Sequence, residues 1–246
     1  MDSGGTKDLL SWHTLSGGSN LNFSTYIPDR AMAIAAHPDD FELRAGGTLL
    51  KWAAAGCQVT GVVCTGSPQR QIEQRAAAVE LGLAHIVFLG YPDGGLEDTN
   101  SFRGELVQQI RRYRPEVVLT HDPARYREFS HRDHRTTGQV TLDAIYPDAR
   151  DECFFPEHLS DGLATHNVSC CLLWESDEPK VVIEISDQIQ SKIRALKCHQ
   201  SQLAGLLSMH DAVVDIDEMV KESARQATTE NEMAYAEAFR FLRAPC

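Results

Sequence analysis

The stretch Ala31-Met32-Ala33-Ile34-Ala35-Ala36-His37-Pro38-Asp39-Asp40 joins six consecutive apolar residues to a short polar turn. An apolar block of this length predicts a strand that is buried on both faces of a parallel sheet. The amphipathic residues that follow, 41–55, predict a helix that ends at Gly56. A buried strand followed by a helix is the repeating unit of an α/β fold.

The same alternation continues along the chain. Strands are predicted at 58–64, 86–89 and 117–120, and helices at 71–81, 102–113 and 134–145. After residue 148 the pattern is looser, with predicted strands at 169–173 and 181–185, a long helix from 187 to about 206, and helical C-terminal segments. We therefore expect one α/β domain over residues 29–246, a Rossmann-like three-layer sandwich with a mostly parallel sheet, after an N-terminal arm over residues 1–28.

Composition and charge exclude several classes of protein. The 246 residues carry a formal net charge of −12, which argues against binding to a nucleic-acid backbone. The seven cysteines form no C-x-x-C motif and several lie in apolar runs, so we expect free thiols in a reducing cytoplasm. No stretch is apolar enough to cross a membrane, and no membrane partner is expected.

Open α/β sheets bind their ligands where the strands end. The first strand is followed by His37, Asp39 and Asp40 rather than by the G-x-G-x-x-G of a dinucleotide site, so a nucleotide cofactor is not expected. A histidine and an aspartate three residues apart can direct a nitrogen and an oxygen to one metal ion. Alternatively, an aspartate here caps the helix and His37 lies at the surface.

A second cluster of such residues follows the fourth predicted strand. It comprises Thr120-His121-Asp122 and then Ser130-His131-Arg132-Asp133-His134. A catalytic zinc site uses three protein ligands, often distant in the chain, and two clusters at one sheet edge fit that requirement. The H-R-D triplet lacks the asparagine of a kinase catalytic loop, and no G-x-S-x-G motif is present.

Together with other motifs, these residues resemble the LmbE/PIG-L family of metal-dependent deacetylases. The motifs are Ala36-His37-Pro38-Asp39-Asp40, Gly46-Gly47-Thr48-Leu49, Arg70 with Glu73, Leu89-Gly90-Tyr91-Pro92-Asp93-Gly94, His131-x-Asp133-His134, His199-x-Ser201-Gln202 and Tyr235-Ala236-Glu237-Ala238-Phe239. The resemblance spans residues 31 to about 241. It implies a Rossmann-like fold, a mononuclear zinc, with Fe²⁺ as another possible metal, and hydrolysis of an N-acetyl group on an amino sugar or its conjugate.

The resemblance also implies a role for each matching residue. The metal ligands would be His37, Asp40 and His134, and Asp39 would be the general base that helps a metal-bound hydroxide attack the amide. His131, oriented by Asp133, would stabilise the oxyanion. Arg70 and Asp93 would bind the sugar. On the residues alone, Arg70 also fits an exposed charge at a helix start and Asp93 a turn. His199 and Tyr235 receive no role.

The sequence departs from the family pattern next to the ligands. Phe41 stands where many members have glutamate, and Glu42 comes next. Arg44 occupies a position that is usually small or apolar, where it can pair with Glu42 or reach the site. The identity of the amide substrate therefore stays open.

Two other classes of function remain possible on the residues alone. One is a non-catalytic α/β module that binds a sugar or a metal. The other, less favoured, is an Fe(II) facial-triad oxygenase that uses His131-x-Asp133 with His166 or His199. A base and an oxyanion donor beside three ligands favour the hydrolase. The resemblance also suggests a homo-oligomer acting on a small molecule.

Overall fold

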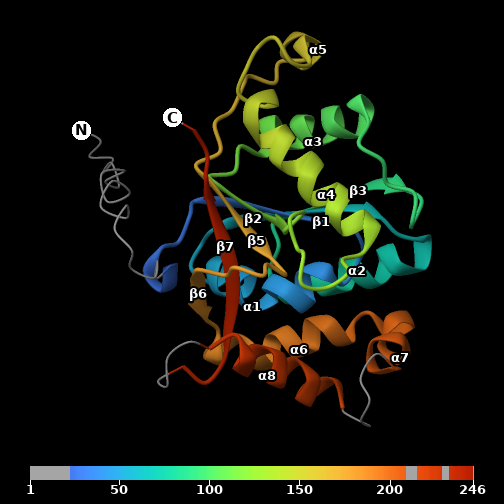
Figure 1. Cartoon of the computed structure of the whole chain (residues 1–246), viewed down its shortest axis with the longest axis vertical. Helices are drawn as coiled ribbons and strands as arrows, with labels where there is room; N and C mark the ends of the chain where they lie inside the picture. Colours follow the sequence, from blue (N-terminus) through green and yellow to red (C-terminus); the bar gives the residue numbers. More distant parts are fainter. Residues whose placement is uncertain (1–22, 209–214, 229–232, 246) are drawn as a thin grey trace.

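The computed structural model describes residues 23–208, 215–228 and 233–245, which form a seven-stranded sheet between two layers of helices (Figure 1). The strands are β1 (Arg30–Ala35), β2 (Gln58–Thr65), β3 (His85–Tyr91), β4 (Val117–His121), β5 (Cys170–Trp174), β6 (Val181–Glu184) and β7 (Ala236–Arg243). They lie in the order β3-β2-β1-β4-β5-β7-β6. The five strands from β3 to β5 pair in parallel, whereas β7 runs antiparallel to both of its neighbours.

Strand β1 occupies the centre of the parallel part because nearly all of its side chains are apolar and buried. It pairs with β2 on one side and with β4 on the other, so that Ala31 lies opposite both Val59 and Val117. The connections after β1 and β4 leave the sheet in opposite directions at this point. Such a switch point opens a crevice at the carboxyl ends of the two strands.

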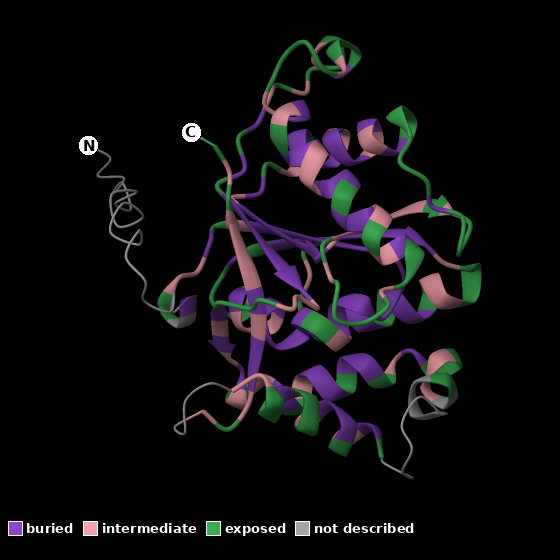
Figure 2. Ribbon diagram, viewed as in Figure 1, coloured by how far each residue is buried: buried purple, intermediate pink, exposed green. Residues whose placement is uncertain are grey.

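The helices cover both faces of the sheet. They are α1 (Asp40–Ala54), α2 (Pro68–Leu81), α3 (Asn100–Tyr113), α4 (Arg132–Asp143), α5 (Pro156–Ser160), α6 (Ile189–Lys197), α7 (Gln200–Ser208) and α8 (Ile216–Gln226). One hydrophobic core joins one face of the sheet to α1, α6 and α8, and a second joins the other face to α3 and α4. Buried residues concentrate along these contacts (Figure 2). The predicted three-layer α/β fold is confirmed.

Two predictions for the C-terminal third are wrong. The predicted long helix from 187 to about 206 is divided into α6 and α7, because His199 and Ser201 turn inward to the carboxylates of Glu42 and Glu73. The end of the chain, predicted to be helical, forms strand β7 between β5 and β6. Helix α8 agrees with the prediction of a helical segment in this region.

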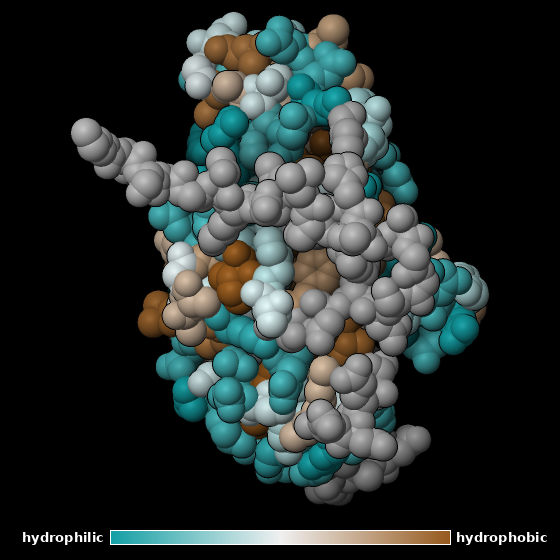
Figure 3. Space-filling model, turned by 90° about the vertical axis from the view of Figure 1, so that its left-hand side faces the viewer, coloured by the Kyte–Doolittle hydropathy of each residue, from teal (hydrophilic) through white to brown (hydrophobic). Residues whose placement is uncertain are grey.

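Most of the expected N-terminal arm, residues 1–22, lies outside the residues that the structure describes, so the arm stays a prediction. Phe23 is buried, and its ring centroid lies 5.5 Å from that of Phe241 on β7. On the face seen in Figure 3, the visible described residues are mostly hydrophilic, with hydrophobic ones scattered among them. Within the described part of the chain, no helix combines the length and the apolar character that crossing a bilayer requires.

Candidate metal centre

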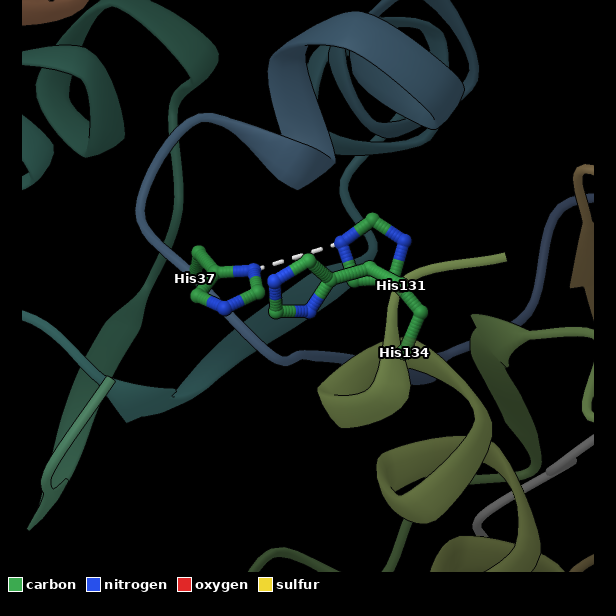
Figure 4. A group of neighbouring side chains, drawn as sticks. All are labelled: His37, His131 and His134. Atoms are coloured by element: carbon green, nitrogen blue, oxygen red, sulfur yellow. Dashed lines mark hydrogen bonds between the residues drawn. The ribbon is translucent and has the colours of Figure 1, made fainter. Parts of the chain in front are cut away.

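The two predicted clusters meet at the carboxyl ends of β1 and β4. His37 lies on the turn between β1 and α1, and His131 and His134 lie at the start of α4; in Figure 4 the three rings lie side by side. The turn is closed by the Asp40 carboxylate, whose Oδ2 accepts the backbone N–H of His37 at 2.8 Å. Between them, Asp39 takes a left-handed conformation with φ of 92°, which directs the chain into α1.

The three predicted ligands lie together, and a different oxygen of Asp40 faces each of the two imidazoles. His37 Nδ1 lies 3.2 Å from His134 Nε2 and 3.6 Å from Asp40 Oδ2, and His134 Nε2 lies 3.4 Å from Asp40 Oδ1. A tetrahedral ion with ligands at about 2.0–2.1 Å separates its donors by roughly 3.3 Å. Two imidazoles and a carboxylate are also a donor set that zinc accepts, so these residues fit a divalent metal.

The charges in the site reinforce one another. Burial alone would raise the pKa of Asp40, but hydrogen bonds and charge interactions with His121 and His134 outweigh it and hold this pKa well below its ordinary value. Burial opposes protonation of His134, yet Asp40 and Glu175 raise its pKa to about 10. The cluster therefore favours positive charge at the place where the three donor atoms meet.

Asp39 lies beside the ligands in a different environment. Burial, together with the neighbouring Asp40 carboxylate, raises its pKa to about 7, against the opposing charge of Arg70. Arg70 Nη2 donates to the carbonyl oxygen of Pro38 at 2.7 Å and lies 3.4 Å from Asp39 Oδ2, while its Nη1 lies 3.2 Å from Asp93 Oδ2. The structure thus brings Arg70 and the half-exposed Asp93 to the edge of the site. A carboxylate that titrates near neutrality suits a general base.

His131 lies next to His37, with ring centroids 4.8 Å apart. Its Nδ1 accepts the backbone N–H of Asp133 at 3.2 Å, so a neutral ring carries its proton on Nε2. Burial and the neighbouring His37 and His134 lower the pKa of His131, which favours this neutral form. The contact of Asp133 with the His131 ring is therefore made by its backbone N–H.

The Asp133 carboxylate has other partners. It is fully buried, accepts the backbone N–H of Gly94 at 2.7 Å and lies 3.4 Å from His37 Nε2. It therefore ties the loop that carries Asp93 to a candidate metal ligand. Carboxylates commonly hold the second nitrogen of a metal-binding histidine in this way.

Sequence reasoning missed three residues around the ligands: His121, Trp174 and Glu175. His121 ends β4 and lies 3.2 Å from Asp40 Oδ2, and Glu175 directly follows β5 and lies 3.2 Å from His134 Nδ1. A signal for both was present, since each ends or follows a parallel strand next to the switch point. His121 was noticed in its cluster but was assigned no role.

A second missed group lies behind Asp39. Gln74 Oε1 accepts the backbone N–H of Asp39 at 3.1 Å, and Gln74 Nε2 donates to Glu42 Oε1 at 2.8 Å. Glu42 Oε2 lies 3.3 Å from Nε2 of His199, the histidine of the unexplained late motif. Gln74, Glu42 and His199 are fully buried, so this chain of contacts supports the left-handed turn at Asp39 from inside the protein.

Comparisons with known proteins show which family this chain resembles. The model of the family described as PIG-L, GlcNAc-PI de-N-acetylase, matches residues 32–145. The diacetylchitobiose deacetylase of Thermococcus kodakarensis is 30% identical, over 75% of this chain and 75% of the relative. A 1D-myo-inositol 2-acetamido-2-deoxy-alpha-D-glucopyranoside deacetylase of Actinosynnema mirum is 26% identical, over 72% of this chain and 81% of the relative.

A solved structure shows the same fold. The N,N'-diacetylchitobiose deacetylase of Pyrococcus horikoshii, in complex with an inhibitor, superimposes with a TM-score of 0.78 at 26% identity, covering 90% of this chain and 85% of that chain. The family expected from the motifs is thereby confirmed. This chain belongs to the PIG-L (LmbE) family of deacetylases.

Proposed function

We propose that this protein is a zinc hydrolase that removes the acetyl group from an N-acetylated amino sugar or a small conjugate of one. The observation that carries the proposal is that His37 Nδ1 and His134 Nε2 lie 3.2 Å apart, each 3.4–3.6 Å from one oxygen of Asp40, with the Asp39 carboxylate alongside. The named activities of the relatives, both deacetylases of acetamido sugars, supply the substrate class.

His37, Asp40 and His134 would hold the metal, and zinc is the ion that their donor set favours over harder cations. When bound, such an ion acts as a Lewis acid that lowers the pKa of water toward neutrality and polarises a carbonyl oxygen. Asp93 and Asp133 lie on the far side of the His37 ring, at its Nε2, which leaves Nδ1 as the ligand atom.

The residues of this chain then divide the proton transfers. Asp39 takes a proton from the attacking water on its carboxylate and delivers it to the departing amine nitrogen, which a pKa near 7 permits in both directions. His131 directs its Nε2–H into the site, where it can donate to the amide oxygen as negative charge develops. Arg70 orients Asp39 and, with Asp93, offers hydrogen bonds to sugar hydroxyls.

The test is release of free amine from a substrate panel with and without a chelator. N-acetylglucosamine, N,N'-diacetylchitobiose and an acetylated peptide are offered to the full chain loaded with zinc. We expect amine from the sugars, no amine after chelation, and recovery when zinc is restored. Stoichiometric zinc binding without amine release from any acetamido sugar would contradict the hydrolase and favour a binding module.

Two further expectations belong to the same proposal. We expect the protein to act in a reducing cytoplasm, which is a prediction from its cysteines. We also expect it to assemble into a homo-oligomer, which is a prediction from the family resemblance. Six cysteines among the described residues are unpaired, four of them buried. Sedimentation analysis of the purified chain measures the oligomeric state directly.

A further inference from the structure

Glu175 is a buried carboxylate in direct contact with several parts of the site. It follows β5 immediately and takes a left-handed conformation with φ of 59°, which is uncommon for a residue with a side chain. Only 5% of its side chain is exposed. Its Oε2 lies 3.0 Å from His121 Nδ1 and 3.2 Å from His134 Nδ1. The carboxylate thus faces two imidazoles at once.

The proton of His134 can be placed from a partner that has no alternative. A carboxylate can only accept, so His134 Nδ1, which lies 3.2 Å from Glu175 Oε2, is the nitrogen that carries the proton in this contact. His121 has a different surrounding, because the Trp174 indole N–H points to its Nδ1 at 2.9 Å and the backbone N–H of Ala36 points to its Nε2 at 3.3 Å.

A proton on Nδ1 of His134 leaves the lone pair of the neutral ring on Nε2. Nε2 is the atom that lies 3.2 Å from His37 Nδ1 and 3.4 Å from Asp40 Oδ1. The His121 ring stacks on His134 with centroids 4.0 Å apart, and its Nε2 lies 3.2 Å from Asp40 Oδ2. His134 therefore presents the lone pair of its Nε2 toward His37 and Asp40.

Glu175 is itself held from the opposite side. Its second oxygen, Oε1, lies 2.6 Å from Nη2 of Arg44 on α1 and 3.8 Å from Nη1 of Arg125 on the loop before α4. Arg44 therefore pairs with Glu175 and not with Glu42. One oxygen of Glu175 serves the arginines and the other serves His134, so the plane of the carboxylate is determined by partners on both sides.

We propose that Glu175 is a positioning residue that selects the metal-binding form of His134, and that Arg44 keeps Glu175 in place. The inference rests on the proposed metal site, because it assigns a task to the ring nitrogen of His134 that faces away from the ion. Histidines that bind metals usually donate their other ring N–H to a carboxylate or carbonyl, and removal of that partner weakens metal binding by about 10–100-fold.

The decisive variant is Glu175→Gly. Glycine accepts the left-handed backbone without strain, so the side chain is removed while the turn is kept. Zinc affinity of the full chain is measured by competition with a chromophoric chelator, and we expect about 10–100-fold weaker binding. Arg44→Met should also weaken zinc binding, but by a smaller factor. The Arg44 side chain is 40% exposed, and its buried partner Glu175 stays in the protein when Arg44 is replaced.

A matched control comes from the same loop. Glu178 is an exposed carboxylate that accepts a hydrogen bond from the Tyr126 hydroxyl, away from the ligands. Glu178→Gln removes one negative charge from the neighbourhood and should bind zinc as tightly as the wild type. A loss of affinity equal to that of Glu175→Gly would assign the effect to net charge and overturn the proposal.

A second measurement separates positioning from general stability. In zinc-loaded protein labelled with ¹⁵N, the Nδ1–H of His134 should give a downfield proton signal that exchanges slowly with water, and Glu175→Gly should lose it. A lower Tm of the metal-free variant with unchanged zinc affinity and an unchanged signal would show a purely structural role. If the wild-type protein binds zinc but releases no amine, only the proposed reaction is contradicted. If the wild-type protein does not bind zinc, both proposals are overturned.

Discussion

Two buried groups of charged side chains contact helix α1, and their contrast shows how a functional cluster differs from a structural one. In the ion pair of Lys192 and Glu237, Nζ lies 2.6 Å from Oε1. The Glu237 carboxylate also accepts the backbone N–H groups of Gly47 and Thr48, both at 2.8 Å, and Lys192 donates to the carbonyl oxygen of Leu43. Each charge in this pair has an opposite charge and a backbone partner.

The group around His37 and His134 is arranged differently. Two imidazole nitrogens face each other at 3.2 Å, and the carboxylates of Asp39 and Asp40 come from adjacent residues. Groups of like character are thus held together at the carboxyl ends of the strands, an arrangement that a cation would satisfy. In the structural pair each charge has one opposite charge, whereas in the site two histidines and two aspartates lie together within one turn and one helix start. The predictions below test this distinction.

The largest effect is expected at the base. Asp39→Asn removes the proton acceptor but none of the three candidate ligands, so kcat should fall by about 10²–10⁴-fold while zinc stays bound. Metal content and amine release are measured on the same preparation, with His134→Ala as the control that loses zinc. Loss of zinc from Asp39→Asn would make Asp39 a ligand and refute its assignment as the base.

The structural pair should respond in stability instead of catalysis. Lys192→Met leaves the buried Glu237 carboxylate without its cation, which should lower the free energy of unfolding by about 3–5 kcal/mol. Denaturant unfolding measures this change, and zinc affinity of the remaining folded protein should not change. The double variant Lys192→Met with Glu237→Gln, which carries no unpaired charge, should recover part of the loss. A double variant as unstable as the sum of both single variants would contradict the pairing.

A smaller effect is expected where α1 approaches the strand edge. A Cβ on Gly47 would lie 2.6 Å from three side-chain atoms of Ile185, so Gly47→Ala should lower the free energy of unfolding by about 1–3 kcal/mol. Gly205→Ala on α7 is the matched control, because no atom of the described residues lies within 4 Å of its added Cβ. Equal stabilities of the two variants would show that α1 shifts to make room.

The smallest effect concerns pH. Burial lowers the pKa of His166, against a hydrogen bond to the carbonyl oxygen of Pro115 at 2.7 Å. The His166 imidazole therefore takes up a proton at higher pH in the unfolded chain than in the folded protein. Its contribution to the free energy of unfolding is fully present above about pH 6.5 and is lost as the pH falls through the pKa of His166 in the folded protein. His166→Gln keeps a donor without this titration. Its unfolding free energy should depend less on pH below 6.5, and an identical pH profile would contradict the assignment.

The parallel half of the fold was predictable because its signals are local. Apolar blocks such as residues 31–36 and helix periodicity between glycines predict β1, α1 and β2 within one residue, and α2 begins three residues before its predicted start. Strand β7 was not predictable, because Ala236-Glu237-Ala238-Phe239 has a composition that suits a helix as well as a strand. Pairing with β5 and β6, and the Lys192 partner of Glu237, decide its conformation from distant parts of the chain.

The candidate site follows the same division. The motifs predicted His37, Asp40, His134 and their neighbours as site residues, because these residues directly follow a predicted strand or begin a helix close to the end of a strand. Gln74 lies in no motif, and Glu175 is marked only by its position directly after a predicted strand, so their positions in space were needed to link them to Asp39 and His134. The partner of Arg44 was left open between Glu42 and the site, and the structure pairs it with Glu175.

By itself, the sequence determined which donor atoms are available and which local elements carry them, because strand and helix periodicity are properties of neighbouring residues. The tertiary structure decided how near those atoms come, and that the backbone N–H of Asp133 contacts Nδ1 of His131. The physical reason is that these features depend on the parallel register of β1 with β4 and on side chains packed from β5 and α2, which are set by burial of the whole sheet.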